Sequence, residues 1–410
     1  MTRHAARSVV LSRLFASSFL VLSTSTVLFA ACGGDDGGGI PAPGDNAGGD
    51  GGSESSVTDG RAEEQDTGTA DATTDGGADA GVPPLDLSNV SEKTWSWFEI
   101  PGTTCRDGSP AGIGLNLNPA SKKMVIYLEG GGACFNGITC LQNPANVSRK
   151  SASGGILDRG RAENPVADWN QVYVPYCTGD VHAGNNPNAD VPNVGPQKFV
   201  GYANMSIFLH KLAATFPATD QILLTGISAG GFGAAANFGQ ATRIFPTTRV
   251  NLVDDSGPLM RQPPLAQCLQ EQWITLWKLD TTVIAECGAD CAGQADPLIA
   301  ATKHWAKVKP NMAQGLISTT GDQTIRFFFG FGASDCKAIL SVSPDDFAAG
   351  LADVKAQHAG YANFGAYLYR GTGHTIIGGN GFYTTTVGGT SVADWVATIV
   401  DSNTITNVGP

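Results

Sequence analysis

Apolar and polar positions along most of this 410-residue chain form blocks that are typical of parallel strands joined by helices. Short apolar runs, each expected to be a buried strand, lie at residues 123–128, 171–176, 221–227, 249–253, 315–319 and 366–369. Stretches with helical character lie at residues 199–216, 229–244 and 391–400. The alternation predicts one α/β domain over residues 86–410, with a doubly wound, mostly parallel sheet and helices on both faces.

The first 31 residues follow a different pattern. Arg3, Arg7 and Arg13 precede an apolar stretch over residues 14–31, which is typical of a secretory signal peptide. A membrane-spanning anchor is the weaker alternative, because six Ser and Thr residues dilute the apolar run. The stretch ends in Leu-Phe-Ala-Ala-Cys, which resembles a bacterial lipobox apart from Phe29, and this predicts lipidation of Cys32. We therefore expect an exported protein, either secreted or held as an outer-membrane or cell-surface lipoprotein.

Residues 32–85 consist mainly of Gly, Asp, Ala and Thr and contain almost no large apolar side chains. Such a segment cannot offset the entropy cost of ordering, so we expect a disordered tether. Residues 33–84 hold 12 of the 37 acidic residues and a single arginine, and 21 basic and 25 acidic residues remain after Pro84. This near-neutral balance, with no basic stripe in the sequence, argues against a nucleic-acid partner.

Cysteine usage agrees with export. Besides Cys32 there are eight cysteines, an even number that predicts disulfides in an oxidising compartment. Spacing favours a Cys134–Cys140 bridge and, more weakly, Cys287–Cys291, and it leaves the other pairings open. Zinc is the alternative, but the sequence contains no Cys-x-x-Cys or ligand-type His spacing, so we expect neither a metal nor another cofactor. The disulfide candidates are Cys105, Cys134, Cys140, Cys177, Cys268, Cys287, Cys291 and Cys336.

The clearest chemical signal is the segment 223–231, where an apolar strand breaks at Gly-x-Ser-x-Gly into a Gly/Ala-rich helix. This arrangement predicts a nucleophile elbow with Ser228 at its tip. A second signal is Glu129-Gly130-Gly131-Gly132-Ala133-Cys134, directly after the first apolar strand. The amides of Gly131 or Gly132 and of Ala229 are candidate donors for an oxyanion hole. The alternative for the glycine cluster is a plain tight turn.

A nucleophilic serine needs a histidine base and an acid that orients it. His374 follows the last apolar strand, where this topology delivers its base, and His182 on a loop is the second candidate. Asp322 follows the penultimate strand and gives the chain order Ser, Asp, His of α/β-hydrolases. Its rivals are Asp254 and Asp255, which could instead line the pocket or cap a helix. The remaining histidines of the folded part lie in helical stretches, where packing or surface roles are expected.

These segments resemble the pectin acetylesterase and Notum family of carboxylesterases. Residues 128–134 are similar to its Leu-Glu-Gly-Gly-Gly-Trp-Cys segment, and residues 225–231 are similar to its nucleophile segment. Further similarities lie at residues 105–110, 164–177 and 255–257. The resemblance implies an α/β-hydrolase fold, catalytic roles for Ser228, Asp322 and His374, and an oxyanion hole at Gly131, Gly132 and Ala229.

Two positions depart from the family pattern. Ala133 stands where the family usually has tryptophan, which would open the acyl pocket. The segment around His374 lacks the cysteine that often precedes the histidine. Ala133, Asp255 and His182 are the residues that we expect around the substrate.

The expected activity is a serine carboxylesterase that removes O-acetyl or other acyl groups from a polysaccharide such as pectin. We expect a monomer that a lipid on Cys32 tethers to a membrane. A polyester depolymerase or feruloyl-type esterase is the alternative enzyme. The non-enzymatic alternative is a surface lipoprotein that keeps the hydrolase fold as a binding module.

Overall fold

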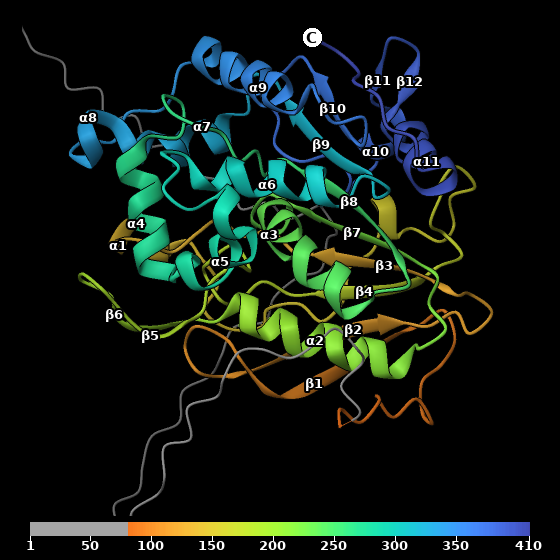
Figure 1. Cartoon of the computed structure of the whole chain (residues 1–410). Helices are drawn as coiled ribbons and strands as arrows, with labels where there is room; N and C mark the ends of the chain where they lie inside the picture. Colours follow the sequence, from red (N-terminus) through yellow and green to blue (C-terminus); the bar gives the residue numbers. More distant parts are fainter. Residues whose placement is uncertain (1–80) are drawn as a thin grey trace, which may run out of the picture. The chain divides into compact units, whose positions relative to one another are not determined.

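The computed structural model describes residues 81–410, so the predicted signal peptide, Cys32 and nearly all of the predicted tether lie outside the described residues. The centre of the described part is an eight-stranded sheet with the order β1-β2-β4-β3-β7-β8-β9-β10 (Figure 1). Neighbouring strands from β4 to β10 are parallel, whereas β1 and β2 form an antiparallel edge beside β4. The sheet strands are β1 (Trp95–Thr104), β2 (Pro110–Asn116), β3 (Lys123–Leu128), β4 (Asn170–Val174), β7 (Gln221–Ile227), β8 (Arg249–Asp255), β9 (Gln314–Thr319) and β10 (Phe364–Tyr369).

Two small hairpins and eleven helices complete the secondary structure of residues 81–410, together with short 3₁₀ turns. The hairpins are β5 (Asn186–Val191) with β6 (Gly195–Phe199) and β11 (Thr386–Val387) with β12 (Thr390–Ser391). The helices are α1 (Gly137–Leu141), α2 (Gly201–Thr215), α3 (Ala229–Ile244), α4 (Gln267–Trp277), α5 (Val283–Cys287), α6 (Pro297–Val308), α7 (Gln323–Phe329), α8 (Ala333–Cys336), α9 (Pro344–His358), α10 (Gly381–Thr384) and α11 (Val392–Ser402).

Strand alternation builds an apolar core on each face of the sheet. In β3, Met124 and Ile126 pack in the cluster that includes α2 and α3, while Val125 and Tyr127 pack in the cluster that includes α11. Each cluster continues across the neighbouring strands. The two faces therefore need apolar residues at nearly every strand position, which explains the continuous apolar runs in the sequence.

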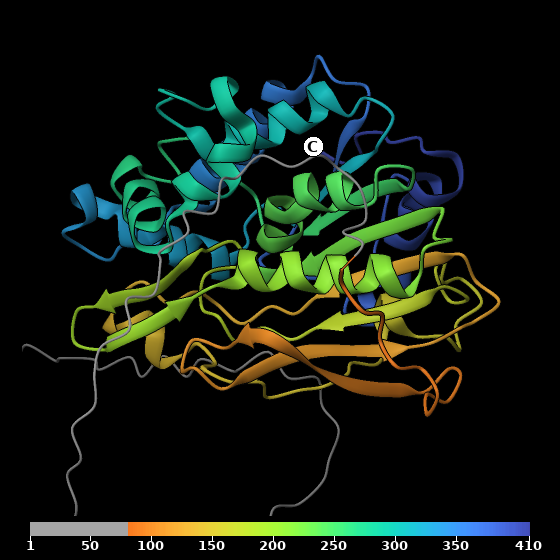
Figure 2. The same cartoon turned by 60° about the horizontal axis from the view of Figure 1, so that its bottom comes forward.

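A third apolar cluster joins the helices that follow β8 to the loops that follow β3 and β4. Trp273 and Trp277 of α4 stack at 5.5 Å between ring centroids, and Phe135 contacts both rings. Figure 2 shows this group of helices beside the sheet and its covering helices α2 and α3. The helices α4–α9 thus form a cap, and the cap has an apolar core of its own.

Four disulfides join all eight cysteines of the described part. The two pairs favoured by spacing, Cys134–Cys140 and Cys287–Cys291, are both present. The other two bridges, Cys105–Cys177 and Cys268–Cys336, close long loops of the chain. The last of these ties α4 to α8 within the cap.

The chain after α11 returns to the edge strand β10. The backbone N–H of Leu368 donates to Val408 at 2.8 Å, and that of Val408 donates to Ala366 at 2.8 Å. The Asn407 side chain accepts from the Ala366 N–H at 2.9 Å. Residues 405–408 therefore cover part of the hydrogen-bonding edge of β10.

The predicted α/β architecture with helices on both faces is confirmed. The apolar pattern gave the bounds of β3, β7 and α3 without error, and the other predicted elements differ by a few residues at their ends. The antiparallel strands β1 and β2 and the helices of the cap are additions that the pattern did not indicate. No helix in residues 81–410 is both long and apolar enough to cross a membrane.

Candidate active site

Ser228 lies at a sharp turn between β7 and α3. Its backbone has φ 56° and ψ −122°, a conformation that a non-glycine residue rarely adopts and that costs free energy of order 1–3 kcal/mol. The Ser228 N–H donates to the carbonyl of Asp255 at 2.8 Å, and the Ser228 carbonyl accepts from Gly231 and Phe232 in the first turn of α3. These bonds hold the strained turn in place.

The elbow requires glycine on both sides because α3 begins very close to the sheet. A Cβ on Gly226 would lie 2.3 Å from the carbonyl oxygen of Gly230, and one on Gly230 would lie 2.0 Å from that of Leu128. Real Cβ atoms do not approach backbone atoms so closely. The Gly-x-Ser-x-Gly pattern is therefore a consequence of helix-to-strand packing at this point.

The glycine loop after β3 runs beside Ser228. A Cβ on Gly130 would lie 3.0 Å from the Cβ of Ser228, and Gly132 has a φ of 77°, which favours glycine. Within residues 81–410, the backbone N–H groups of Gly131, Gly132 and Ala229 make no hydrogen bond. Three unpaired donors close to one serine are the arrangement that an anionic oxygen needs.

Two partly buried hydrogen bonds fix the start of this loop. The Nε2 of His182 donates to the carbonyl of Glu129 at 2.9 Å, and the Glu129 carboxylate accepts from the Tyr176 N–H at 2.9 Å. Burial lowers the pKa of His182 to about 4, so the ring is neutral at pH 7 and carries its single proton on the nitrogen that donates. Burial also raises the pKa of Glu129.

His374 and Asp322 lie together after β10 and β9. The Nδ1 of His374 donates to Oδ2 of Asp322 at 2.7 Å, and both side chains are buried. The other oxygen of Asp322 accepts from the backbone N–H groups of Thr324 and Ile325, each at 3.0 Å, which caps α7. The Nε2 of His374 is buried and has no hydrogen-bond partner in the described part of the chain. The arrangement leaves one imidazole nitrogen able to take a proton.

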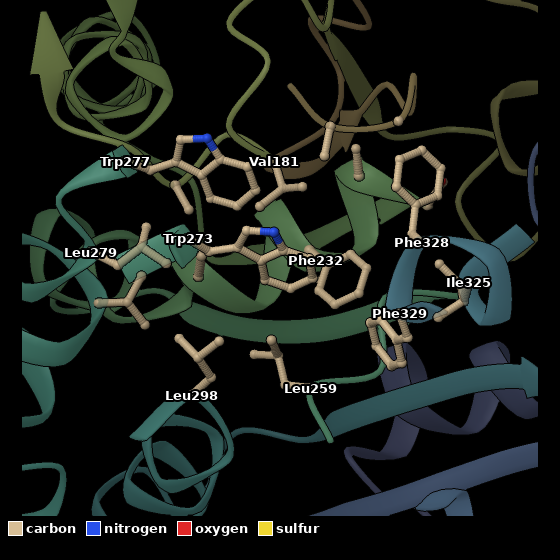
Figure 3. Close-up of a pocket in the computed structure, with 17 residues that line it drawn as sticks. Val181, Phe232, Leu259, Trp273, Trp277, Leu279, Leu298, Ile325, Phe328 and Phe329 are labelled. Carbon is tan, nitrogen blue, oxygen red and sulfur yellow. The ribbon is translucent and has the colours of Figure 1, made fainter. Parts of the chain in front are cut away.

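A deep apolar cavity opens at Ser228. Its volume is about 650 Å³ including the part open to solvent, and Ser228, Ala229, Gly132 and Ala133 form one end of it. The remaining lining residues come from the loops after β4 and β8, from α3 and from the cap, and Figure 3 labels ten of the lining residues around the cavity. These ten are Val181, Phe232, Leu259, Trp273, Trp277, Leu279, Leu298, Ile325, Phe328 and Phe329. The cavity therefore offers a hydrocarbon surface to whatever group is held at the serine.

The model of the Pectinacetylesterase family matches residues 96–299, which include the elbow, the glycine loop and part of the cap. This match and the Notum relatives support membership of the pectinacetylesterase and Notum family of carboxylesterases. It is 31% identical over 172 residues to the palmitoleoyl-protein carboxylesterase NOTUM of Mus musculus, a match that covers 38% of this chain and 33% of that protein. It is 33% identical over 159 residues to palmitoleoyl-protein carboxylesterase notum1a of Danio rerio, covering 34% and 30% of the two chains.

The matched segments span only about a third of the length of these curated relatives. A solved structure of the Wnt deacylase Notum from Drosophila extends the likeness at the level of the fold. It aligns with a TM-score of 0.58 at 20% sequence identity and covers 76% of this chain and 94% of that one. The two chains thus share the α/β-hydrolase fold over most of the described residues.

Within this pectinacetylesterase and Notum fold, one of the three expected pocket residues lies on the cavity. Ala133 lines it, next to Gly132. The structure does not place Asp255 or His182 there. The Asp255 carboxylate is turned toward the backbone of Ile376 and Ile377, and His182 is held under the glycine loop by Glu129.

The rival acids are engaged elsewhere. Asp254 is buried and accepts from the Gly257 N–H at 2.7 Å, and burial raises its pKa well above the usual value. Neither Asp254 nor Asp255 has a hydrogen bond to His374. Among the candidate acids, Asp322 alone contacts the His374 ring within the described residues.

Sequence reasoning missed most of the cavity wall. Trp273 and Trp277 of α4 and Phe328 of α7 lie on the cavity, although they are more than forty positions from the elbow in the sequence. The run of three phenylalanines at 327–329, directly after the Asp322 turn, was a possible signal. Residues 81–410 contain no cluster of three or more His, Cys, Asp or Glu side chains placed to hold a metal ion.

Proposed function

We propose that this protein is a serine carboxylesterase in which Ser228 is the nucleophile, His374 the general base and Asp322 the residue that orients the base. The observation that carries the proposal is the meeting of Ser228 with unpaired backbone donors at an apolar cavity that opens to solvent. The 2.7 Å hydrogen bond between His374 and Asp322 supports the assignment of the base and its acid.

In this mechanism, the Ser228 Oγ attacks the acyl carbonyl while its proton passes to Nε2 of His374. The carbonyl oxygen becomes an anion and accepts from the amides of Gly132 or Gly131 and of Ala229. His374 then gives the proton to the departing alcohol, which leaves an acyl-enzyme on Ser228. A water molecule, deprotonated by His374, attacks the acyl-enzyme, the bond between the acyl carbon and the Ser228 Oγ breaks as His374 returns the proton to that Oγ, and the acid leaves. Each oxyanion donor of this kind is typically worth about 3 kcal/mol in the transition state.

The cavity favours an acyl group larger than acetyl. An acetyl group would leave most of the Trp273, Trp277 and Phe329 surface uncovered, whereas a longer hydrocarbon chain or an aromatic acyl group would bury it. The proposed primary substrates are therefore esters with a hydrocarbon acyl part of about six carbons or more. The relatives named as palmitoleoyl-protein carboxylesterases are consistent with an apolar acyl group.

O-acetyl groups on a polysaccharide are the second candidate substrate. The match to the Pectinacetylesterase model over residues 96–299 supports it. We propose export for either substrate, because four disulfides are expected only where the surroundings are oxidising. Lipid attachment at Cys32, together with its consequences for membrane location, remains a proposal from the sequence.

A panel of aryl esters with acetyl, butyryl, octanoyl and feruloyl groups, run beside acetate release from acetylated pectin, tests function and substrate together. We expect kcat/KM to rise from acetyl to octanoyl, and Ser228→Ala to lose at least about 10³-fold in kcat. Ser206→Ala on α2 is the matched control and should keep full activity. A fluorophosphonate probe should label wild type but not Ser228→Ala. Full activity in Ser228→Ala would overturn the mechanism, and preference for acetylated pectin would overturn the choice of acyl group.

A further inference from the structure

Asp255, at the end of β8, contacts the two segments that carry Ser228 and His374. Its backbone carbonyl accepts from the Ser228 N–H at 2.8 Å. Its carboxylate oxygen Oδ2 accepts from the N–H groups of Ile376 at 2.6 Å and Ile377 at 2.8 Å, in the loop directly after His374. One residue thus connects the nucleophile turn to the histidine loop, 121 residues further along the chain.

The neighbouring Ser256 reinforces the connection. Its Oγ donates to Oδ1 of Asp255 at 2.9 Å and accepts from the Thr375 N–H at 3.3 Å. Ser256 and Thr375 have φ values of 67° and 61°, so both backbones lie in the left-handed region that such residues adopt only when held. Asp255 and Ser256 are fully buried, so no solvent competes for these bonds.

The carboxylate of Asp255 neither binds the His374 ring nor faces the cavity. Asp322 occupies Nδ1 of His374, and Asp255 does not line the cavity. We propose that Asp255 is a positioning residue, whose carbonyl and carboxylate together set the separation between the Ser228 Oγ and the His374 Nε2. This proposal, which we call the Asp255 bridge, rests on the proposed function and deepens it.

The acceptor geometry distinguishes two variants. Asp255→Asn keeps an oxygen where Oδ2 now accepts both N–H groups, and its amide nitrogen faces the Ser256 Oγ, which is able to accept. Asp255→Ala removes the acceptors and leaves two buried N–H groups unpaired. If geometry is what Asp255 supplies, Asn rescues most of the function that Ala loses.

For Asp255→Ala we expect kcat on an octanoyl aryl ester to fall by about 10²-fold with KM within about threefold, because misplacement of about 1 Å costs that much. Fluorophosphonate labelling of Ser228 should slow in parallel. Asp255→Asn should lie within about tenfold of wild type. Val396→Ala, in the core on the α11 face, is the matched control for lost stability and should keep wild-type kcat.

Hydrogen exchange gives a readout that does not depend on activity. The amides of residues 375–377 should exchange faster in Asp255→Ala than in wild type and Val396→Ala, and Asp255→Asn should restore their protection. If Asp255→Ala fails to fold, Ser256→Ala is the less disruptive substitution. It should give faster exchange at the Thr375 amide and a smaller fall in kcat than expected for Asp255→Ala.

Two results would overturn the Asp255 bridge. One is an Asp255→Ala protein with wild-type kcat. The other is an Asp255→Asn protein whose kcat is as low as that of Asp255→Ala, because the loss would then come from the missing negative charge of the carboxylate. A wild-type protein that neither hydrolyses esters nor takes the probe would instead overturn the proposed function.

Discussion

At the residue scale, the candidate site depends on groups whose positions are fixed by buried hydrogen bonds. His182 is buried and Glu129 is half-buried beside the glycine loop, and His358 is buried on α9, away from the site. Burial lowers the pKa of both histidines and raises that of Glu129, so in each case it favours the neutral form. Such groups make the free energy of unfolding depend on pH, since in the unfolded chain they titrate at their ordinary pKa values.

His358 offers the cleanest test because it lies on α9, away from Ser228. Burial lowers its pKa to about 4, while its Nδ1 contacts the Val354 carbonyl and its ring stacks on Phe364. Below pH 6.5 the His358 ring is protonated in the unfolded chain but stays neutral in the folded chain until the pH approaches 4. We therefore expect His358 to remove up to about 3 kcal/mol of unfolding free energy as pH falls from 6.5 to 4.

Urea unfolding of wild type and His358→Gln at pH 7.5 and pH 4.5 measures this effect. The variant should be less stable than wild type at pH 7.5, because it loses the stacking on Phe364. Its unfolding free energy should then fall less than that of wild type between pH 7.5 and pH 4.5. Because the other titratable groups are the same in both proteins, subtracting one fall in unfolding free energy from the other removes their contribution. Equal losses in both proteins would show that His358 does not resist protonation.

Ala133 lines the cavity at a position where the family resemblance led us to expect tryptophan. Ala133→Trp would place an indole in the cavity that Ala133 and Ser228 both line. We expect kcat/KM for octanoyl esters to fall by about tenfold or more, with acetyl esters changed much less. The ratio of the two values, which is independent of enzyme concentration, is the measurement. An unchanged ratio would place the acyl group outside this cavity.

At the element scale, the sequence was most informative where a local pattern decides the structure. The strands β3 and β7 could be predicted because their apolar runs end at or beside glycines that close packing requires. The helix α3 could be predicted because a Gly/Ala-rich stretch follows directly after Ser228. The antiparallel strands β1 and β2 could not be predicted, since β2 joins the sheet by pairing with β4 and β1 joins it only by pairing with β2, and neither pairing can be read from the apolar pattern. Ser228, Asp322 and His374 could be proposed as catalytic from their positions after strands, whereas the contacts of Asp255 involve partners 121 residues away and could not be read from the sequence.

The closest approach of α3 to β3 gives a prediction about packing. Gly230→Ala would place a Cβ 2.0 Å from the Leu128 carbonyl oxygen, and both backbones are held by their neighbours. We expect a loss of at least about 3 kcal/mol of unfolding free energy, or no folded protein. Gly360→Ala, whose Cβ would meet no heavy atom within 4 Å, is the control and should change stability by less than about 0.5 kcal/mol. Denaturant unfolding of wild type and the two variants measures these changes in unfolding free energy.

At the scale of the whole described molecule, disulfides compensate for a cap made of short helices. The Cys268–Cys336 bridge joins residues 68 positions apart, and the Cys287–Cys291 bridge joins residues 4 apart. On the chain-entropy account, the first contributes about 4 kcal/mol to stability and the second about 2 kcal/mol. The double variant Cys268→Ala/Cys336→Ala should thus melt well below Cys287→Ala/Cys291→Ala in calorimetry. The reverse order would contradict this account.

The return of residues 405–408 along β10 has a consequence for assembly. A strand at the border of a sheet offers unpaired N–H and C=O groups to any other extended chain. Residues 405–408 occupy part of those groups on β10. A chain truncated before Ile405 should therefore associate with itself in a concentration-dependent way, visible by light scattering even while Ser228 still reacts with its probe.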